Sequence, residues 1–110
     1  MHAAAAAATV LSIAFSPNGG GTQTHRTLTC GPAGGTLPRA AQACSRLAAM
    51  DVNPFRPVPE NVACTDIYGG PETARVVGTF RGRPIWVVFR QTNGCEIARW
   101  RRVSFLFSSS

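Results

Sequence analysis

Four cysteines stand in a chain of only 110 residues, and they limit what the chain can fold into. A chain of this length forms one domain, whose core gives a thin stability margin. An even number of cysteines in such a chain is typical of a disulfide framework made in an oxidising compartment. Four cysteines can pair in three ways, and the residues alone leave all three open. The cysteines are Cys30, Cys44, Cys64 and Cys95.

The same cysteines are poor candidates for a metal site. No pair has the C-x-x-C spacing that is common in zinc sites, and His2 and His25 lie far from any cluster of ligands. Two dispersed histidines and paired cysteines also make a Cys–His or Ser–His–Asp arrangement improbable. No glycine-rich phosphate loop follows a strand and opens a helix. We therefore expect neither an enzyme nor a bound metal or cofactor.

The order of residue types predicts strands and one helix. Pro38 suits the first turn of a helix, and apolar residues recur at helical spacing up to Met50. Residues 51–61 contain three prolines and are expected to be irregular. Arg81-Gly82-Arg83-Pro84 is typical of a hairpin turn. Runs rich in β-branched and aromatic residues predict strands at 9–15, 25–30, 73–80, 85–91 and 103–107.

This pattern predicts an α+β fold, an antiparallel β-sheet of about five strands with one main α-helix packed on one face. We expect the domain to cover residues 9–107, with a short polar tail at 108–110. Residues 1–8, rich in alanine, are interpreted as a disordered leader or the remnant of a signal peptide. No run of 18 apolar residues is present, so we expect no membrane-spanning helix.

The formal net charge is +6, and all 11 basic residues are arginine. A basic chain can attract nucleic acid, and one tight group, Arg99, Arg101 and Arg102, keeps that hypothesis open. The other arginines are spread along the chain, which favours a solvated basic face over a nucleic-acid site.

A compound motif links the first two cysteines. Cys30 begins Cys-Gly-Pro-Ala-Gly-Gly-Thr-Leu-Pro, a turn rich in glycine and proline, and Cys44 follows in the helix-like stretch Ala-Cys-Ser-Arg-Leu. This motif resembles the signature of the Streptomyces subtilisin inhibitor family, small secreted proteins that block serine proteases. The chain departs from the family pattern at Leu37, where the family has His, and at Ser45, where it usually has Ala, Thr or Asp.

The resemblance implies several properties of the chain. It implies a secreted, extracellular inhibitor with no enzymatic activity, and it implies a homodimer formed through sheet faces. The expected partners are serine proteases, with no nucleic acid and no membrane. The implied disulfides are Cys30–Cys44 and Cys64–Cys95.

The resemblance also assigns a reactive-site loop. In the family the residue two positions after the third cysteine is P1, which enters the specificity pocket of the protease, and the bond after it is the scissile one. By position, P1 is Asp66 and P1′ is Ile67. Asn93, two residues before Cys95, matches a family asparagine that supports the loop by hydrogen bonds. The implied loop residues are Ala63, Cys64, Thr65, Asp66, Ile67 and Tyr68.

Asp66 is the main departure from the family, which usually has Met or Lys at P1. An ionised carboxylate is strongly disfavoured in an apolar pocket. The chain is therefore expected to inhibit subtilisin-like proteases weakly, or to suit acid-preferring proteases of the glutamyl type. The alternatives are an inhibitor-like binding module without inhibition and a basic extracellular protein that binds nucleic acid.

Overall fold

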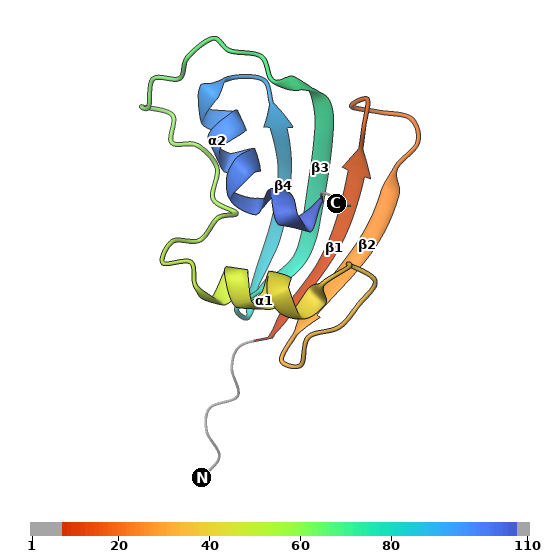
Figure 1. The fold of residues 1–110 in the computed structure, drawn as a ribbon. Helices are drawn as coiled ribbons and strands as arrows, with labels where there is room; N and C mark the ends of the chain where they lie inside the picture. Colours follow the sequence, from red (N-terminus) through yellow and green to blue (C-terminus); the bar gives the residue numbers. More distant parts are fainter. Residues whose placement is uncertain (1–7, 108–110) are drawn as a thin grey trace.

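The computed structural model describes residues 8–107, which form one antiparallel sheet covered on one face by two helices (Figure 1). The strand order in the sheet is β2-β1-β3-β4. The expected α+β class is confirmed. The predicted tail at 108–110 and all of the predicted leader except Ala8 lie outside the described residues. The elements are β1 (Thr9–Ser16), β2 (Thr24–Cys30), α1 (Ala40–Ala48), β3 (Gly70–Phe80), β4 (Arg83–Gln91), α2 (Gly94–Val103) and the short 3₁₀ helix η1 (Ser104–Leu106).

The central strand β1 shows why this sequence forms a sheet with one covered face. Leu11 and Ile13 are buried, whereas Ser12 between them is exposed, as expected for side chains that alternate across a strand. In the register, Leu11 lies opposite Leu28 of β2 and Gly78 of β3. Gly78 has a φ of 146°, and a side chain there would collide with the backbone of β1.

The hairpin between β3 and β4 is tighter than predicted. Its turn is Arg81-Gly82, with φ values of 52° and 82°, the positive values that two-residue hairpin turns require. Arg83 and Pro84, expected in the turn, already pair with β3. The Arg81 guanidinium donates hydrogen bonds to the carbonyl oxygens of Leu47 (3.0 Å) and Met50 (3.2 Å). The turn thus bonds to carbonyls at and just beyond the end of α1, where Leu47 also accepts from the Met50 N–H at 3.3 Å.

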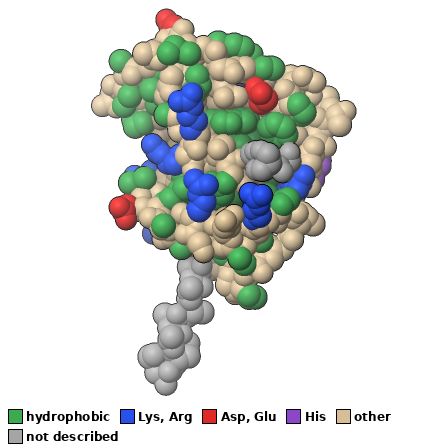
Figure 2. Space-filling view, viewed as in Figure 1, with side chains coloured by type: hydrophobic (Ala, Val, Ile, Leu, Met, Phe, Trp, Pro, Cys, Tyr) green, Lys and Arg blue, Asp and Glu red, His purple; other side chains and the backbone are tan. Residues whose placement is uncertain are grey.

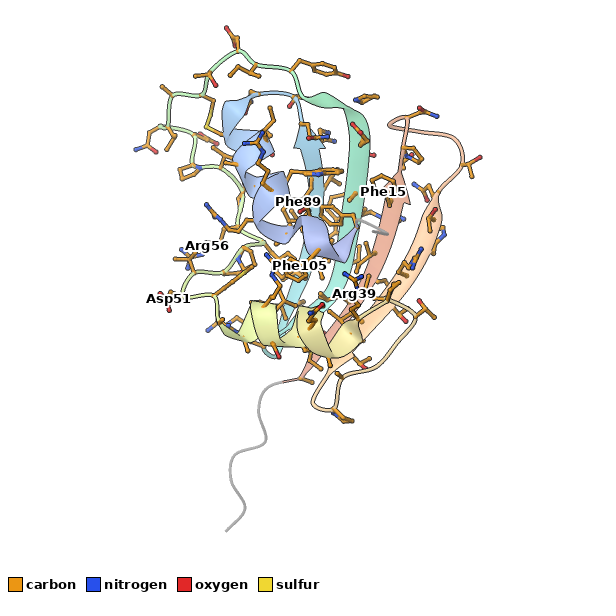
Figure 3. All side chains as sticks on the ribbon, viewed as in Figure 1. Phe15, Arg39, Asp51, Arg56, Phe89 and Phe105 are labelled. Carbon is orange, nitrogen blue, oxygen red and sulfur yellow. A yellow bond between two sulfur atoms is a disulfide. The ribbon has the colours of Figure 1, made fainter. Side chains whose placement is uncertain are left out.

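Aromatic rings join the sheet to the segments that cover it. Phe89 of β4 is fully buried, and Figure 3 shows it beneath α2. Its ring centroid lies 6.1 Å from that of Phe55 and 5.5 Å from that of Phe107. Phe55 comes from the long connection between α1 and β3, and Phe107 follows η1. One side chain of the sheet therefore contacts two distant parts of the chain.

The prediction of a strand at 103–107 was wrong, because these residues form the end of α2 and the helix η1. Val103, Leu106 and Phe107 are buried, and their spacing of three and four residues is that of a helix face. The described residues therefore contain four strands instead of about five. The predicted helix 38–50 is confirmed as the shorter α1, which begins after Arg39 in a left-handed conformation.

Replacing Phe89 with alanine should destabilise the fold strongly. Truncation of a buried Phe costs about 3–5 kcal/mol, because the apolar contacts are lost and a cavity remains. The free energy of unfolding, measured by denaturant titration, should fall by that amount. The exposed neighbour Arg90 provides the control, and Arg90→Ala should change it by less than about 0.5 kcal/mol. Equal losses in the two variants would contradict the central position of Phe89.

Candidate functional site

Both expected disulfides are present. Cys30–Cys44 joins the end of β2 to α1, and Cys64–Cys95 joins the long connection before β3 to the first turn of α2. In the chain-entropy model such bridges, whose cysteines are 14 and 31 positions apart in the sequence, stabilise a fold by about 3 and about 4 kcal/mol. The second bridge fixes a segment that has no secondary structure of its own.

This segment, residues 63–68, is called the tethered loop below. It runs with the rest of the connection along the outside of the molecule, past α2 and over the end of the sheet, before the chain enters β3 (Figure 1). Asp66 is exposed, and Ile67 and Tyr68 are 56% and 66% exposed. Exposed apolar side chains on a loop held by a rigid scaffold are typical of a binding site.

Three attachments hold the chain on either side of Asp66 and Ile67. On the N-terminal side are the disulfide of Cys64 and a 2.9 Å hydrogen bond from the Gly94 N–H to the Thr65 carbonyl oxygen. On the C-terminal side, the Gly69 N–H donates to the Gln91 carbonyl oxygen at 2.7 Å. The Asp66–Ile67 bond thus lies between fixed points on α2 and β4.

Asn93 caps the helix to which the loop is attached. Its side-chain oxygen accepts a hydrogen bond of 2.9 Å from the Glu96 N–H. The expected hydrogen bonds from the Asn93 side chain to the loop do not occur among residues 8–107, and its support of the loop stays a prediction. The direct contact comes instead from Gly94, which sequence reasoning missed. A cue was present, because Asn93 followed three residues later by Glu96 is a helix N-terminus pattern.

A residue with a side chain would not fit easily at position 94. An added Cβ would collide with the hydroxyl oxygen of Thr65, so the absence of a side chain lets the loop approach the start of α2. Gly94 therefore serves the loop through close backbone approach, a role that an Asn-Gly turn alone would not reveal.

The three arginines of the possible nucleic-acid patch do not form one surface. Arg101 and Arg102 are exposed, but Arg99 is buried and its guanidinium donates to Glu96 at 2.7 Å. Figure 2 shows the basic side chains of the helix-covered face as separate groups among apolar and polar ones. This arrangement does not favour a continuous site for a polyanion.

Residues 8–107 contain no cluster of metal ligands and no membrane-spanning helix. No group of three or more His, Cys, Asp or Glu side chains there is placed to hold a metal ion. None of the helices in this range is long and apolar enough to cross a membrane.

Residues 5–93 match the model of a protein family described as subtilisin inhibitor-like. The chain belongs to this family. The match spans most of the chain, including three of the four cysteines and the whole tethered loop. No curated protein sequence matches the chain.

The subtilisin inhibitor-like fold is also found in a solved structure. The chain is similar to one in the crystal structure of Streptomyces caespitosus sermetstatin in complex with Bacillus licheniformis subtilisin, with a TM-score of 0.58 and 21% sequence identity. The similarity covers 92% of this chain and 98% of the other. At this identity the likeness shows a shared fold. Family membership, by contrast, places the chain among protease inhibitors and not among enzymes.

Substitutions at Asn93 can separate the helix cap from an amide contact with the loop. Asn93→Ala removes the cap and should lower the free energy of unfolding by about 1 kcal/mol. Asn93→Asp keeps the oxygen that accepts from Glu96 but loses the amide donor, so it should have the stability of the wild type. Denaturant titration measures both. A loss in the Asp variant as large as that in the Ala variant would contradict the cap.

Proposed function

We propose that this chain inhibits serine proteases by presenting residues 63–68 to the protease cleft, with Asp66 as P1 and Ile67 as P1′. The observation that carries the proposal is a loop exposed at these two residues and fixed on both sides, in a chain of the subtilisin inhibitor-like family. Ala63, Cys64 and Thr65 would lie before P1, and Tyr68 after P1′.

The attachments of the loop suit this mode of binding. An extended segment can add to a cleft as a strand, with affinity from main-chain hydrogen bonds and specificity from alternate side chains. A segment already held in place loses less conformational entropy on binding than a free peptide does. The Cys64–Cys95 bridge and the Gly94–Thr65 hydrogen bond therefore support inhibition over simple cleavage.

Asp66 decides which proteases the loop fits. A carboxylate that enters an apolar pocket must lose its water or take up a proton, and both cost free energy. A pocket that carries a basic group would instead give it a charged partner. We therefore propose proteases with acidic P1 preference as the better targets and subtilisin-like proteases as weaker ones.

Changing the charge of Asp66 should shift inhibition in opposite directions for the two protease classes. Asp66→Met removes the desolvation cost in an apolar pocket and adds buried apolar area worth about 1.5–3 kcal/mol. Inhibition of subtilisin should strengthen at least about tenfold, which corresponds to about 1.4 kcal/mol. Inhibition of a glutamyl-type protease should weaken. Inhibition constants for a panel of proteases measure both effects.

The matched control is Asp51→Met, which removes an exposed carboxylate of the same connection outside the tethered loop. It should leave both inhibition constants unchanged. If Asp66→Met changes neither constant by more than about twofold, Asp66 is not P1. If the wild type and all variants inhibit no protease of the panel, the chain is a binding module that shares the fold alone.

The open face of the sheet supports a second proposal, that the protein is a secreted homodimer. Two disulfides suit an oxidising, extracellular compartment. The face opposite the helices carries Trp86, which is 67% exposed, and Val10, which is 49% exposed. Val77 lies between β1 and β4 at the level of Trp86. A large exposed aromatic side chain beside apolar neighbours is typical of a protein interface.

Trp86→Asp should convert this dimer into a monomer, because a charge would be buried without a partner at the interface. Sedimentation velocity measures the mass, and far-UV circular dichroism checks that the fold is kept. Tyr68→Asp is the control, since Tyr68 is equally exposed but lies in the tethered loop. A wild type that sediments as a monomer, or a Trp86 variant that stays dimeric, would contradict the assignment of this face.

A further inference from the structure

A buried charge lies in the helix that holds the tethered loop. Arg99 is only 9% exposed, one turn of α2 after Cys95. Its guanidinium lies over the ring of Phe89, 4.9 Å from the centroid, and donates to the Glu96 carboxylate at 2.7 Å. A basic residue is seldom buried unless it is paired, so this position requires an explanation.

Stability does not explain Arg99 well. Its Nε and Nη2 atoms are buried and have no hydrogen-bond partner among the described residues. Taking a charge out of water costs several kcal/mol, and a buried ion pair recovers this only when all of its hydrogen bonds are made. Replacing such a pair with apolar residues of similar size is often neutral or stabilising. We therefore examine how the contacts of Arg99 orient the residues around it.

The contacts of Arg99 connect the core to the start of α2. Phe89 is fully buried in the core, and Arg99 contacts both its ring and the carboxylate of Glu96. The backbone N–H of Glu96 in turn donates to the cap residue Asn93. Gly94 and Cys95 lie between Asn93 and Glu96 in the sequence. The Gly94 N–H and the Cys95 sulfur are the two groups of α2 that hold the loop. The first turn of the helix is thus capped by Asn93 and also held against the core through Glu96 and Arg99.

We propose that Arg99 is a positioning residue for the tethered loop. Its ion pair with Glu96 and its contact with Phe89 fix the first turn of α2, so that Gly94 and Cys95 hold Thr65 and Cys64 in one place. Arg99 is buried against Phe89 and acts only through the helix. The inference rests on the proposed inhibitory function for its consequence, but its physical content concerns the free protein.

Amide hydrogen exchange on the free protein tests the proposal without a protease. Arg99→Met keeps much of the side-chain length and removes the charge. Exchange of the Gly94 amide, which reports the hydrogen bond to Thr65, should become at least about tenfold faster, whereas amides of β1 and β3 should exchange as in the wild type. Arg102→Met makes the same change at an exposed site of the same helix and should have no effect.

Two further variants distinguish positioning from general stabilisation. If Arg99 and Glu96 act as a unit, Glu96→Leu should accelerate the Gly94 amide by a similar factor, and the double variant by no more than either alone. Arg99→Lys keeps the charge and should restore part of the protection, and it replaces the Met variant if that variant fails to fold. Equal acceleration of Gly94 and of the strand amides, or no acceleration, would overturn the proposal.

A cleavage assay with a protease distinguishes failure of this proposal from failure of the proposed function. With a protease that the wild type inhibits, Arg99→Met should be cleaved at Asp66–Ile67 at least about tenfold faster, and Arg102→Met should not. Unchanged cleavage beside a faster Gly94 amide would overturn the link between this helix turn and inhibition. If the wild type inhibits no protease, the proposed function fails, and the exchange data alone decide the role of Arg99.

Discussion

The fold depends on the burial of Phe89 at the centre of the helix-covered face. Its ring contacts Phe55 from the long connection, Phe107 from the C-terminal end and the guanidinium of Arg99 from α2. The long connection lies far in the chain from α2 and the C-terminal end, which follow one another, and its Phe55 also packs on Phe80, with ring centroids 4.9 Å apart. Because aromatic contacts add to the transfer free energy of the ring, one side chain of the sheet orders the three segments around it.

The tethered loop is ordered through a different set of contacts. It has no regular structure and contributes no side chain to the buried core, so burial cannot fix its shape. Covalent and hydrogen bonds from α2 and β4 perform this task instead. The packing around Phe89 thus fixes the helix, and the helix fixes the loop. Core packing stabilises the fold, and a separate set of bonds fixes the conformation of the loop. Both sets of interactions involve α2.

Elements with a simple period could be predicted from the sequence, and those set by tertiary contacts could not. Alternation in residues 9–15 predicted β1 because one face of a strand meets the core and the other does not. Residues 103–107 were predicted as a strand because short apolar runs suit both states. In the fold, Val103, Leu106 and Phe107 pack into the core at helical spacing, a tertiary arrangement that the run itself does not specify. Burial of Arg99 left no signal, since its partners Glu96 and Phe89 become relevant only in the fold.

The candidate site shows the same division. The exposed loop and its disulfide followed from a family motif, whereas the role of Gly94 depends on the approach of Thr65 to the helix. Placement of the Asn93 side chain likewise required the helix, because an Asn-Gly pair is equally common in turns. Local patterns therefore predicted a candidate loop, and three-dimensional contacts were needed to explain how that loop is held.

Asp66, Ile67 and Tyr68 are all exposed and lie outside the packed interior. Natural selection can therefore exchange them with little risk to folding, since substitutions at exposed positions usually change stability by less than about 0.5 kcal/mol. If the loop binds proteases as proposed, its target can change through these three positions while the folded framework stays the same.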